Sequence, residues 1–519
     1  MRARASVFGL FAVLWSAYAG NPTPSPSDST VADAAERQDF SEVKRQLVRR
    51  ADPNAAQADG ASALHWAAFH GHPDSTRWLL RAGAKPDATN RFGITPLALA
   101  CASPHGHVAR LLVNAGADPA QTSPGGERPL AIAARSGNLE AVQILLSKGS
   151  DPNATDSKGQ AALHWAASEG HASIIEALVR NGAHLKITLD SGFGPIHLAA
   201  RDGRSEAVAA LLRLGADVQA TIEPRKQVSK GPRRGMSPLL LAVESGHFEL
   251  ALQLVEAGAD PNDQRSGFSP LHALTWVRKP NRGDGEDGDP PPLGSGQVGS
   301  LKFIREIVRR GANPNLQLSS GRGGKAVLHR KGATPFLLAC ATADLPMAKL
   351  LVELGANPGI PNADGSTPLM AAAGLGTMAP TEEAGTGPEV LEMLKYLLAL
   401  GADVNAQDRN GDTAMHGAAY KNLPLAVRLL ADHGAKATSW HQTNRHGWTP
   451  VKIAEGYRVG NYKPSPDTVQ ALHQLLIAAG HPPPPPGPPA GMKLGEDYAP
   501  PPPPPRASRQ DQVSKDAKP

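Results

Sequence analysis

The sequence is poor in cysteine, in aromatic residues and in long apolar runs. It has two cysteines, and aromatic residues make up 4% of the chain. Two cysteines exclude the dense disulfide framework of small secreted proteins. The scarcity of aromatic residues predicts a core built from Ala, Leu, Val and Ile. No apolar run reaches the roughly 20 residues that a membrane-spanning helix needs, so we expect no membrane span.

Charge of one sign is not in excess either. The net charge is +5 over 519 residues, whereas nucleic-acid binders present a dense basic face, so no nucleic-acid partner is expected. Gly (53 residues) and Pro (48) are abundant and indicate many turns and a low-complexity segment. A chain of this length exceeds one hydrophobic core, which predicts several domains or an array of repeats.

The N-terminal residues have the pattern of an export signal. Arg2 and Arg4 precede a short apolar run over 7–16, and Ala-Tyr-Ala at 17–19 is a small-x-small cleavage pattern before Gly20. We expect a signal peptide over 1–19, a linker over 20–27, and an exported protein, periplasmic or extracellular. An uncleaved anchor and a wrongly assigned start are the alternatives.

A short motif recurs along most of the chain. Gly-Ala-Ser-Ala-Leu-His-Trp-Ala-Ala at 60–68 returns as Gly-Gln-Ala-Ala-Leu-His-Trp-Ala-Ala at 159–167, and Thr/Ser-Pro-Leu variants stand at 95–97, 237–239, 269–271 and 367–369. About 23 residues after the turn glycine comes a second motif, Gly-Ala-x-Pro/Val-Asp/Asn, as at 83–87 and 401–405.

These two spaced motifs resemble the ankyrin-repeat family, whose period is about 33 residues. The resemblance covers residues 28–480 and implies an all-α solenoid of about eleven stacked helix-turn-helix repeats with β-turn fingers, plus an N-terminal cap. The pattern also has a physical reading. Thr-Pro suits a helix start, and Gly after the Leu-rich second helix suits its end. Such units bury their apolar faces only by stacking.

Several residues that suggest chemistry have a structural explanation in this repeat. Five histidines occupy the last position of the Thr-Pro-Leu-His motif, where we expect each to bond turn backbone and join neighbouring repeats (His65, His164, His197, His272 and His416). Cys101 and Cys340 replace the usual Ala and lie several repeats apart, too far for a disulfide.

No motif predicts catalysis. Gly-Ser-Gly-Gln-Val-Gly at 294–299 matches a dinucleotide fingerprint but lacks the preceding strand, and the acidic stretch 284–289 lacks the final Glu of a calcium loop. No nucleophile elbow, HExxH helix or CxxC pair is present. We therefore expect no enzyme, no cofactor and no metal ion.

The resemblance implies that a protein partner docks on the concave side, at the turn tips and the exposed face of each first helix. At the tips these positions are Phe92, Phe193, Phe268 and Trp448. On the first helices they are Phe69, His70, Arg135, Glu169, Arg201, Asp202, Glu244, Trp276, Tyr420 and Lys421. Aromatic residues and Arg are what interface hot spots favour. Alternatively, the tip aromatics pack on adjacent turns.

Inserts interrupt the period at several places. A basic insert at 223–234 carries Arg225, Lys226, Lys230, Arg233 and Arg234, and further inserts lie at 278–300, 316–331, 377–387 and 457–466. Residues 481–519 are rich in proline and predict a disordered tail. The best reading is a monomeric, non-catalytic scaffold outside the cytoplasm that binds an unknown protein. The alternative is a binder of an anionic envelope or matrix polymer through the basic insert.

Overall fold

The computed structural model describes residues 30–103, 106–225, 233–282, 290–321, 323, 327–458 and 464–488. The predicted signal peptide and linker, the acidic stretch 284–289, Lys226 and Lys230 of the basic insert, and residues 489–519 of the predicted tail lie outside these residues. The described residues contain helices and two isolated β-bridges, and no strand.

The chain divides into two compact units. Unit 1 comprises Met1–Ala259 with Gly294–Gly296, and unit 2 comprises Asp260–Leu293 with Gln297–Pro519. Unit 1 holds seven helix pairs: α2 (Val31–Glu36) with α3 (Phe40–Val48), α4 (Ala63–Phe69) with α5 (Pro73–Arg81), α6 (Pro96–Ala102) with α7 (Gly106–Asn114), α8 (Pro129–Ser136) with α9 (Leu139–Ser147), α10 (Ala162–Glu169) with α11 (Ala172–Arg180), α12 (Pro195–Arg201) with α13 (Ser205–Arg213), and α14 (Pro238–Glu244) with α15 (Phe248–Glu256).

Unit 2 is built in the same way from five pairs and one short extra helix. They are α16 (Pro270–Arg278) with α17 (Ser300–Arg309), α18 (Pro335–Ala341) with α19 (Leu345–Glu353), α20 (Pro368–Ala373) with α21 (Gly387–Ala399), α22 (Ala414–Tyr420) with α23 (Pro424–Asp432), α24 (Ala437–Trp440), and α25 (Pro450–Ala454) with α26 (Pro466–Ala478). Twelve pairs match the predicted eleven repeats and N-terminal cap, and the predicted all-α solenoid is confirmed.

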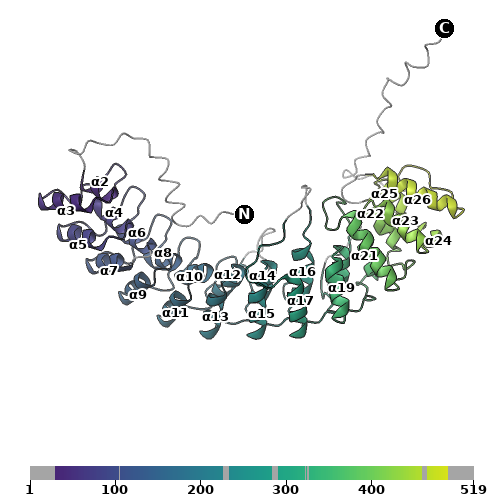
Figure 1. Ribbon diagram of the computed structural model, residues 1–519, viewed down its shortest axis with the longest axis horizontal. Coiled ribbons are helices and arrows are strands. Elements are labelled where there is room, and N and C mark those ends of the chain that lie inside the picture. The colour runs from purple at the N-terminus through teal and green to yellow at the C-terminus, as the bar shows by residue number, and fades with distance from the viewer. Residues whose placement is uncertain are drawn as a thin grey trace, which may run out of the picture. The chain divides into compact units, whose positions relative to one another are not determined.

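Within each unit the helices form two layers (Figure 1). In unit 1, first helices contact first helices from α2 through α14, and second helices contact second helices from α3 through α13. In unit 2 the first-helix layer runs through α16, α18, α20, α22 and α25. Fully buried Ala and Leu fill the space between the layers, because small side chains let neighbouring helices approach closely.

Each repeat begins with a capped helix. Thr95 Oγ1 accepts a hydrogen bond from Ala98 N at 3.1 Å, and Thr334 Oγ1 accepts one from Leu337 N at 3.1 Å. In both helices Pro follows at the first position, where no backbone N–H is needed. The Thr-Pro motif therefore sets where the first helix starts.

Two sets of hydrogen bonds join successive repeats. The predicted histidine set is confirmed for His65, His197 and His272, whereas Nε2 of His164 and of His416 has no hydrogen-bond partner among the described residues. Ser62 N donates to His65 Nδ1 at 3.1 Å, so the proton is on Nε2, which donates to Ile94 O of the next turn at 3.0 Å. A second set uses asparagine, a ladder not anticipated from the sequence: Asn54 Nδ2 donates to Gly83 O (3.0 Å), and its Oδ1 accepts from Lys85 N (2.9 Å).

The histidine bonds depend on a neutral ring. Burial is the main cause that lowers the pKa of His164, His197 and His272 to about 4 and that of His416 to about 3.

The two cysteines are free and buried, and burial raises the pKa of each thiol. Both therefore lie in the environment expected of small core side chains.

Candidate functional site

The predicted binding residues divide sharply between the two units. In unit 1, nine of them are partly or fully exposed: Phe69, His70, Phe92, Arg135, Glu169, Phe193, Arg201, Asp202 and Glu244. In unit 2, Trp276 is half-buried, and the other four are buried: Phe268, Tyr420, Lys421 and Trp448. The expectation that these four face solvent is wrong.

Tyr420 and Lys421 are buried because an insert covers them. The segment 374–386, which follows α20, lies over the end of α22, and Lys421 Nζ donates to Ala384 O at 2.6 Å. From the other side, the guanidinium of Arg458 lies over the Tyr420 ring at 5.5 Å and donates to Thr377 O at 2.6 Å. Burial lowers the pKa of Lys421 to about 8.

The two tip aromatics of unit 2 pack on side chains of their own repeat, whereas the alternative prediction placed them against adjacent turns. Phe268 is 7% exposed and meets the half-buried Trp276 edge to face, with ring centroids 4.8 Å apart. Trp448 is 3% exposed, and its ring lies 5.4 Å from that of His446. A large aromatic side chain at these turns therefore stabilises the array itself.

Several inserts of unit 2 pack together. Arg282 N donates to Glu382 O at 2.6 Å, which joins the insert after α16 to the segment after α20. Gly376 lies so close to the extension before α18 that a Cβ would stand 2.2 Å from Leu328 N. We call residues 279–282, 327–329, 374–386 and 457–458 the unit 2 cover. It occupies the face of α20 and α22 that would otherwise be available to a partner.

The corresponding face of unit 1 carries aromatic rings paired with arginines. The Arg135 guanidinium from α8 lies 4.8 Å from the Trp165 ring of α10, and that of Arg201 lies 5.3 Å from the Phe193 ring. We call Arg135, Trp165, Phe193 and Arg201 the aromatic–arginine strip. Stacking of this kind holds planar side chains in place on a surface without removing them from solvent.

Acidic side chains accompany the strip. Arg135 forms an ion pair with Glu127, and Arg201 Nε pairs with Asp202 Oδ1 at 2.9 Å. Ser168 Oγ donates to Asp202 Oδ2 at 2.6 Å, which links α10 to the end of α12. The strip and its carboxylate partners therefore place oriented side chains of both charges around two aromatic rings.

Trp165 is a candidate that the sequence reasoning missed. It occupies the same motif position as Trp66, which is 5% exposed and donates from Nε1 to Gln57 Oε1 at 2.8 Å. The residue equivalent to Gln57 is Asp156, whose carboxylate binds the amides of its own turn. Trp165 Nε1 has no hydrogen-bond partner among the described residues, and the side chain is half-buried. The Gln-to-Asp difference was one available signal, and Ser168 and Glu169 in place of Phe69 and His70 were another.

The N-terminal part of the unit 1 face is a compact aromatic group. Trp66 and His70 are stacked with centroids 5.8 Å apart, Phe69 meets Trp66 edge to face at 6.0 Å, and His70 Nε2 is 3.2 Å from Glu36 O. At the next turn tip, Phe92 is 50% exposed, with Arg91 over its ring at 4.8 Å. Phe92 is thus the most exposed of the predicted tip aromatics.

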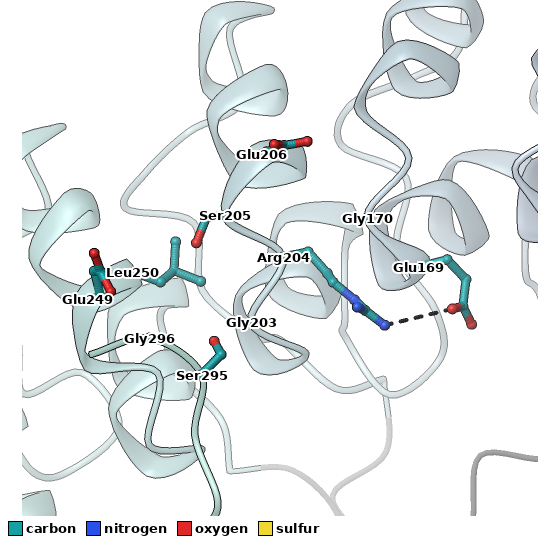
Figure 2. Close-up of a pocket in the computed structure, with 10 residues that line it drawn as sticks. All are labelled: Glu169, Gly170, Gly203, Arg204, Ser205, Glu206, Glu249, Leu250, Ser295 and Gly296. Carbon is teal, nitrogen blue, oxygen red and sulfur yellow. Dashed lines mark ion pairs between the residues drawn. The ribbon is translucent and has the colours of Figure 1, made fainter. Parts of the chain in front are cut away.

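A pocket of about 400 Å³ lies in unit 1 near the C-terminal ends of the first helices, where each first helix connects to its second helix (Figure 2). Its lining comes from the starts of α13 and α15 and from the insert, with the residues Glu169, Gly170, Gly203, Arg204, Ser205, Glu206, Glu249, Leu250, Ser295 and Gly296. Figure 2 shows Arg204 reaching toward Glu169, to which it pairs at 3.7 Å. Three carboxylates and one arginine make this pocket acidic.

The glycine-rich stretch 294–299 has a packing role here. Ser295 N donates to His247 Nδ1 at 2.9 Å, and His247 Nε2 donates to Arg201 O at 3.1 Å. A Cβ on Gly294 would lie 1.8 Å from Gly246 O, so only glycine fits. The resemblance to a dinucleotide fingerprint is explained by this close backbone approach.

The described arginines of the basic insert each face a carboxylate. Arg225 pairs with Asp190 (2.8 Å), Arg233 with Glu244 (3.1 Å) and Arg234 with Glu223 (2.8 Å). These pairs lower the positive potential that an anionic polymer would meet.

In the described part of the chain, no three His, Cys, Asp or Glu side chains are grouped to hold a metal ion. No helix there is both long and apolar enough to cross a membrane.

Known proteins match this chain through its repeats. A family profile described as ankyrin repeats (3 copies) matches residues 31–123, 130–222, 163–265 and 386–473, and an ankyrin repeat profile matches 331–363. Together these ranges cover more than half of the chain.

Relatives share the repeats over part of their length. ZDHHC13 of Danio rerio, named for palmitoyltransferase activity, is 28% identical over 254 residues, which is 45% of this chain and 35% of that protein. Ankyrin repeat and SAM domain-containing protein 6 of Rattus norvegicus is 33% identical over 31% of this chain and 16% of its own length. The B-cell lymphoma 3 protein homolog of Mus musculus is 32% identical over 27% of this chain and 24% of its own length.

This chain therefore spans about a third or less of the relatives that it matches. Ankyrin repeats generally mediate protein–protein interaction. The chain belongs to the ankyrin-repeat family.

Proposed function

We propose that this protein binds a segment of another protein on the first-helix face of unit 1, as a non-catalytic scaffold. The observation that carries the proposal is the contrast between the units. In unit 2 the chain's own cover buries Tyr420 and Lys421, whereas in unit 1 the side chains of the aromatic–arginine strip are partly exposed.

The composition of the strip supports this role. Trp and Arg are enriched at binding hot spots, and both arginines are held in a defined orientation by a ring and a carboxylate. A partner that brings its own carboxylate and an apolar side chain would replace Glu127 or Asp202 at little ordering cost.

The test compares three versions of the full chain as bait in a native extract. Trp165→Ala combined with Arg201→Ala removes one ring and one guanidinium, and Arg213→Ala is the control because Arg213 is an exposed arginine on a second helix. A protein bound by the wild type and the control but lost from the double variant supports the proposal. We expect its affinity to fall at least about tenfold. Equal retention by all three baits would contradict it.

We also propose that binding takes place outside the cytoplasm. The support is the N-terminal pattern of Arg2 and Arg4, an apolar run and Ala-Tyr-Ala before Gly20. Cell fractionation of the chain with a C-terminal tag, with N-terminal sequencing, tests this: we expect a mature protein that begins at Gly20 in the periplasm or medium. Cytoplasmic protein that retains Met1 would contradict export.

The basic insert remains the alternative site, for an anionic polymer. Its three described arginines are paired with carboxylates, so the geometry favours the strip. Retention on an anionic matrix that falls steeply with salt, and that Arg225→Ala with Arg233→Ala abolishes, would favour the insert instead.

A further inference from the structure

The last helix pair of unit 2 contains a lysine where five other repeats have histidine. Lys452 is the third residue after the cap Thr449. The same place after their own caps is held by His65, His164, His197, His272 and His416. In His65, His197 and His272 the ring reaches the turn of the following repeat, with Nε2 3.0–3.2 Å from a backbone carbonyl oxygen.

No further helix pair follows α26 among the described residues, yet Lys452 also reaches backbone carbonyls. Its Nζ donates to Pro485 O at 2.5 Å and to Gly487 O at 2.8 Å, and it pairs with Glu455 Oε2 at 2.9 Å. An ammonium group has three donors, and these three acceptors use all of them. Lys452 is buried, with 7% of its surface exposed.

The segment that Lys452 contacts is a proline run. Residues 481–488 read His-Pro-Pro-Pro-Pro-Pro-Gly-Pro. Proline has no N–H, and a polyproline II helix forms no internal hydrogen bonds, so its carbonyl oxygens are free to accept. A donor with three hydrogens and no acceptor, such as lysine, matches the prolines of this segment, whose backbone offers acceptors alone.

One aromatic contact lies at the start of this segment, and a second lies at Lys452. The Tyr457 ring lies 5.8 Å from Lys452 Nζ, and the rings of His441 and His481 are 5.6 Å apart. His481 N also donates to Leu476 O at 2.9 Å, which fixes the direction in which the chain leaves α26. The run is thus held at its start by α24 and α26 and along its length by Lys452.

We propose that Lys452, Glu455 and Tyr457 form a binding site for an extended proline-rich segment, which the chain's own residues 481–488 occupy. The segment takes the place that the turn of a following repeat holds elsewhere in the array, and it closes the open end of the first-helix layer at α25. The site is distinct from the unit 1 face and does not depend on the function proposed for that face.

The site also accepts the same segment from another molecule when its own is removed. A segment that directly follows α26 has an effective concentration on the order of 1 mM at the site, so in the wild type it excludes a weakly binding peptide. This competition makes the site testable in the full chain.

The experiment uses a fluorescent peptide with the sequence of residues 481–488 and measures its binding by anisotropy. One full-length variant has the five prolines of 482–486 changed to serine, which keeps the length but removes the polyproline conformation. We expect the peptide to bind this variant at least about tenfold more tightly than the wild type, because the competing segment no longer docks. Equal weak binding to both proteins would overturn the proposal.

Two further variants identify the site. In the serine background, Lys452→Met should abolish peptide binding, whereas Lys395→Met, which removes an exposed lysine of α21, should leave it unchanged. Circular dichroism checks that each variant is folded. Loss of binding in both lysine variants, or in neither, would overturn the assignment to Lys452.

The choice of occupant is tested with two other peptides. A serine peptide of equal length should not bind, since its carbonyls are not held in the polyproline conformation. The second proline run, residues 500–505, should bind more weakly than 481–488, because it lacks the histidine that meets His441. Tighter binding of that run would overturn residues 481–488 as the occupant.

Discussion

Asp412 is the residue whose ionisation departs most from its usual behaviour near neutral pH. It is buried in the turn before α22, accepts a hydrogen bond from Asn444 Nδ2 at 2.7 Å, and lies near Asp408. Burial is the main cause that raises the pKa of its carboxyl to about 7, and the charge of Asp408 acts in the same direction.

This shift predicts an unusual pH dependence. Between pH 4 and 7 the folded protein holds a proton on Asp412 that the unfolded chain has released, so stability falls as pH rises through this window. Relative to Asp412→Asn, the free energy of unfolding of the wild type should fall by up to about 1.4 kcal/mol per pH unit. Urea denaturation at pH 5 and pH 8 measures the difference. Parallel pH profiles for the two proteins would refute it.

The exposure of single aromatic residues could not be predicted from the repeat motif. The position of Trp165 was identical in motif to that of Trp66. Trp66 is buried because it donates to Gln57 and packs on Phe69 and His70. The half-buried Trp165 has Asp156, Ser168 and Glu169 at those three places. Phe268 and Trp448 occupy tip positions that resemble that of Phe92, but Phe268 meets Trp276 and Trp448 meets His446. Exposure at a tip depends on the neighbours, which the repeat period does not specify.

At the scale of the helix pair, local signals were sufficient. Thr-Pro at 95–96 and 334–335 and the glycines after each second helix define the boundaries, because capping and helix termination are decided within a few residues. The positions of the inserts in the sequence were predicted correctly, but the surfaces on which they pack were not. The segment 374–386 covers α22 through contacts 37 or more residues away in sequence, such as Lys421 with Ala384.

The asparagine bonds between pairs give a prediction at this scale. Asn405 Nδ2 donates to Gly434 O at 2.9 Å and its Oδ1 accepts from Lys436 N at 2.8 Å. Asn405→Ala loses both bonds and should cost about 1–2 kcal/mol of unfolding free energy, since a typical hydrogen bond contributes about 0.5–1.5 kcal/mol. Chemical denaturation measures the loss.

Asn405→Asp is the matched variant because it keeps only the acceptor. The chain already contains this arrangement at Asp87, whose Oδ1 accepts from Asp118 N at 2.8 Å. Asn405→Asp should therefore lose less stability than Asn405→Ala. An aspartate variant as unstable as the alanine variant would show that the donated bond to Gly434 O dominates.

At the scale of the whole molecule, the buried histidines make the array sensitive to acid. The pKa of His164, His197 and His272 is about 4 in the fold, against 6.5 in an unfolded chain. The unfolded chain therefore binds more protons between these values. The stability that depends on neutral rings is complete above pH 6.5 and is lost as pH falls toward 4.

Proton uptake on unfolding measures this directly. At about pH 5.3, calorimetry in buffers of different ionisation enthalpy should find about one proton taken up for each of these histidines. His197→Asn should reduce the uptake by about one proton. Asp412 acts in the opposite direction, so the double variant with Asp412→Asn separates the two contributions. No change in uptake on replacing His197 would exclude it from the acid response.

Lys452 in the histidine place has a consequence for anyone who wishes to lengthen this protein. Copies of an internal repeat joined after α26 would present a turn carbonyl to a side chain that is already saturated by Glu455, Pro485 and Gly487. A longer array should therefore be spliced upstream of residue 449, with the last pair and its proline run kept together as one terminal module. The residue at position 452 therefore decides whether a further repeat can dock: a histidine there can bond the turn of a following repeat, whereas Lys452 is already bonded to the proline run.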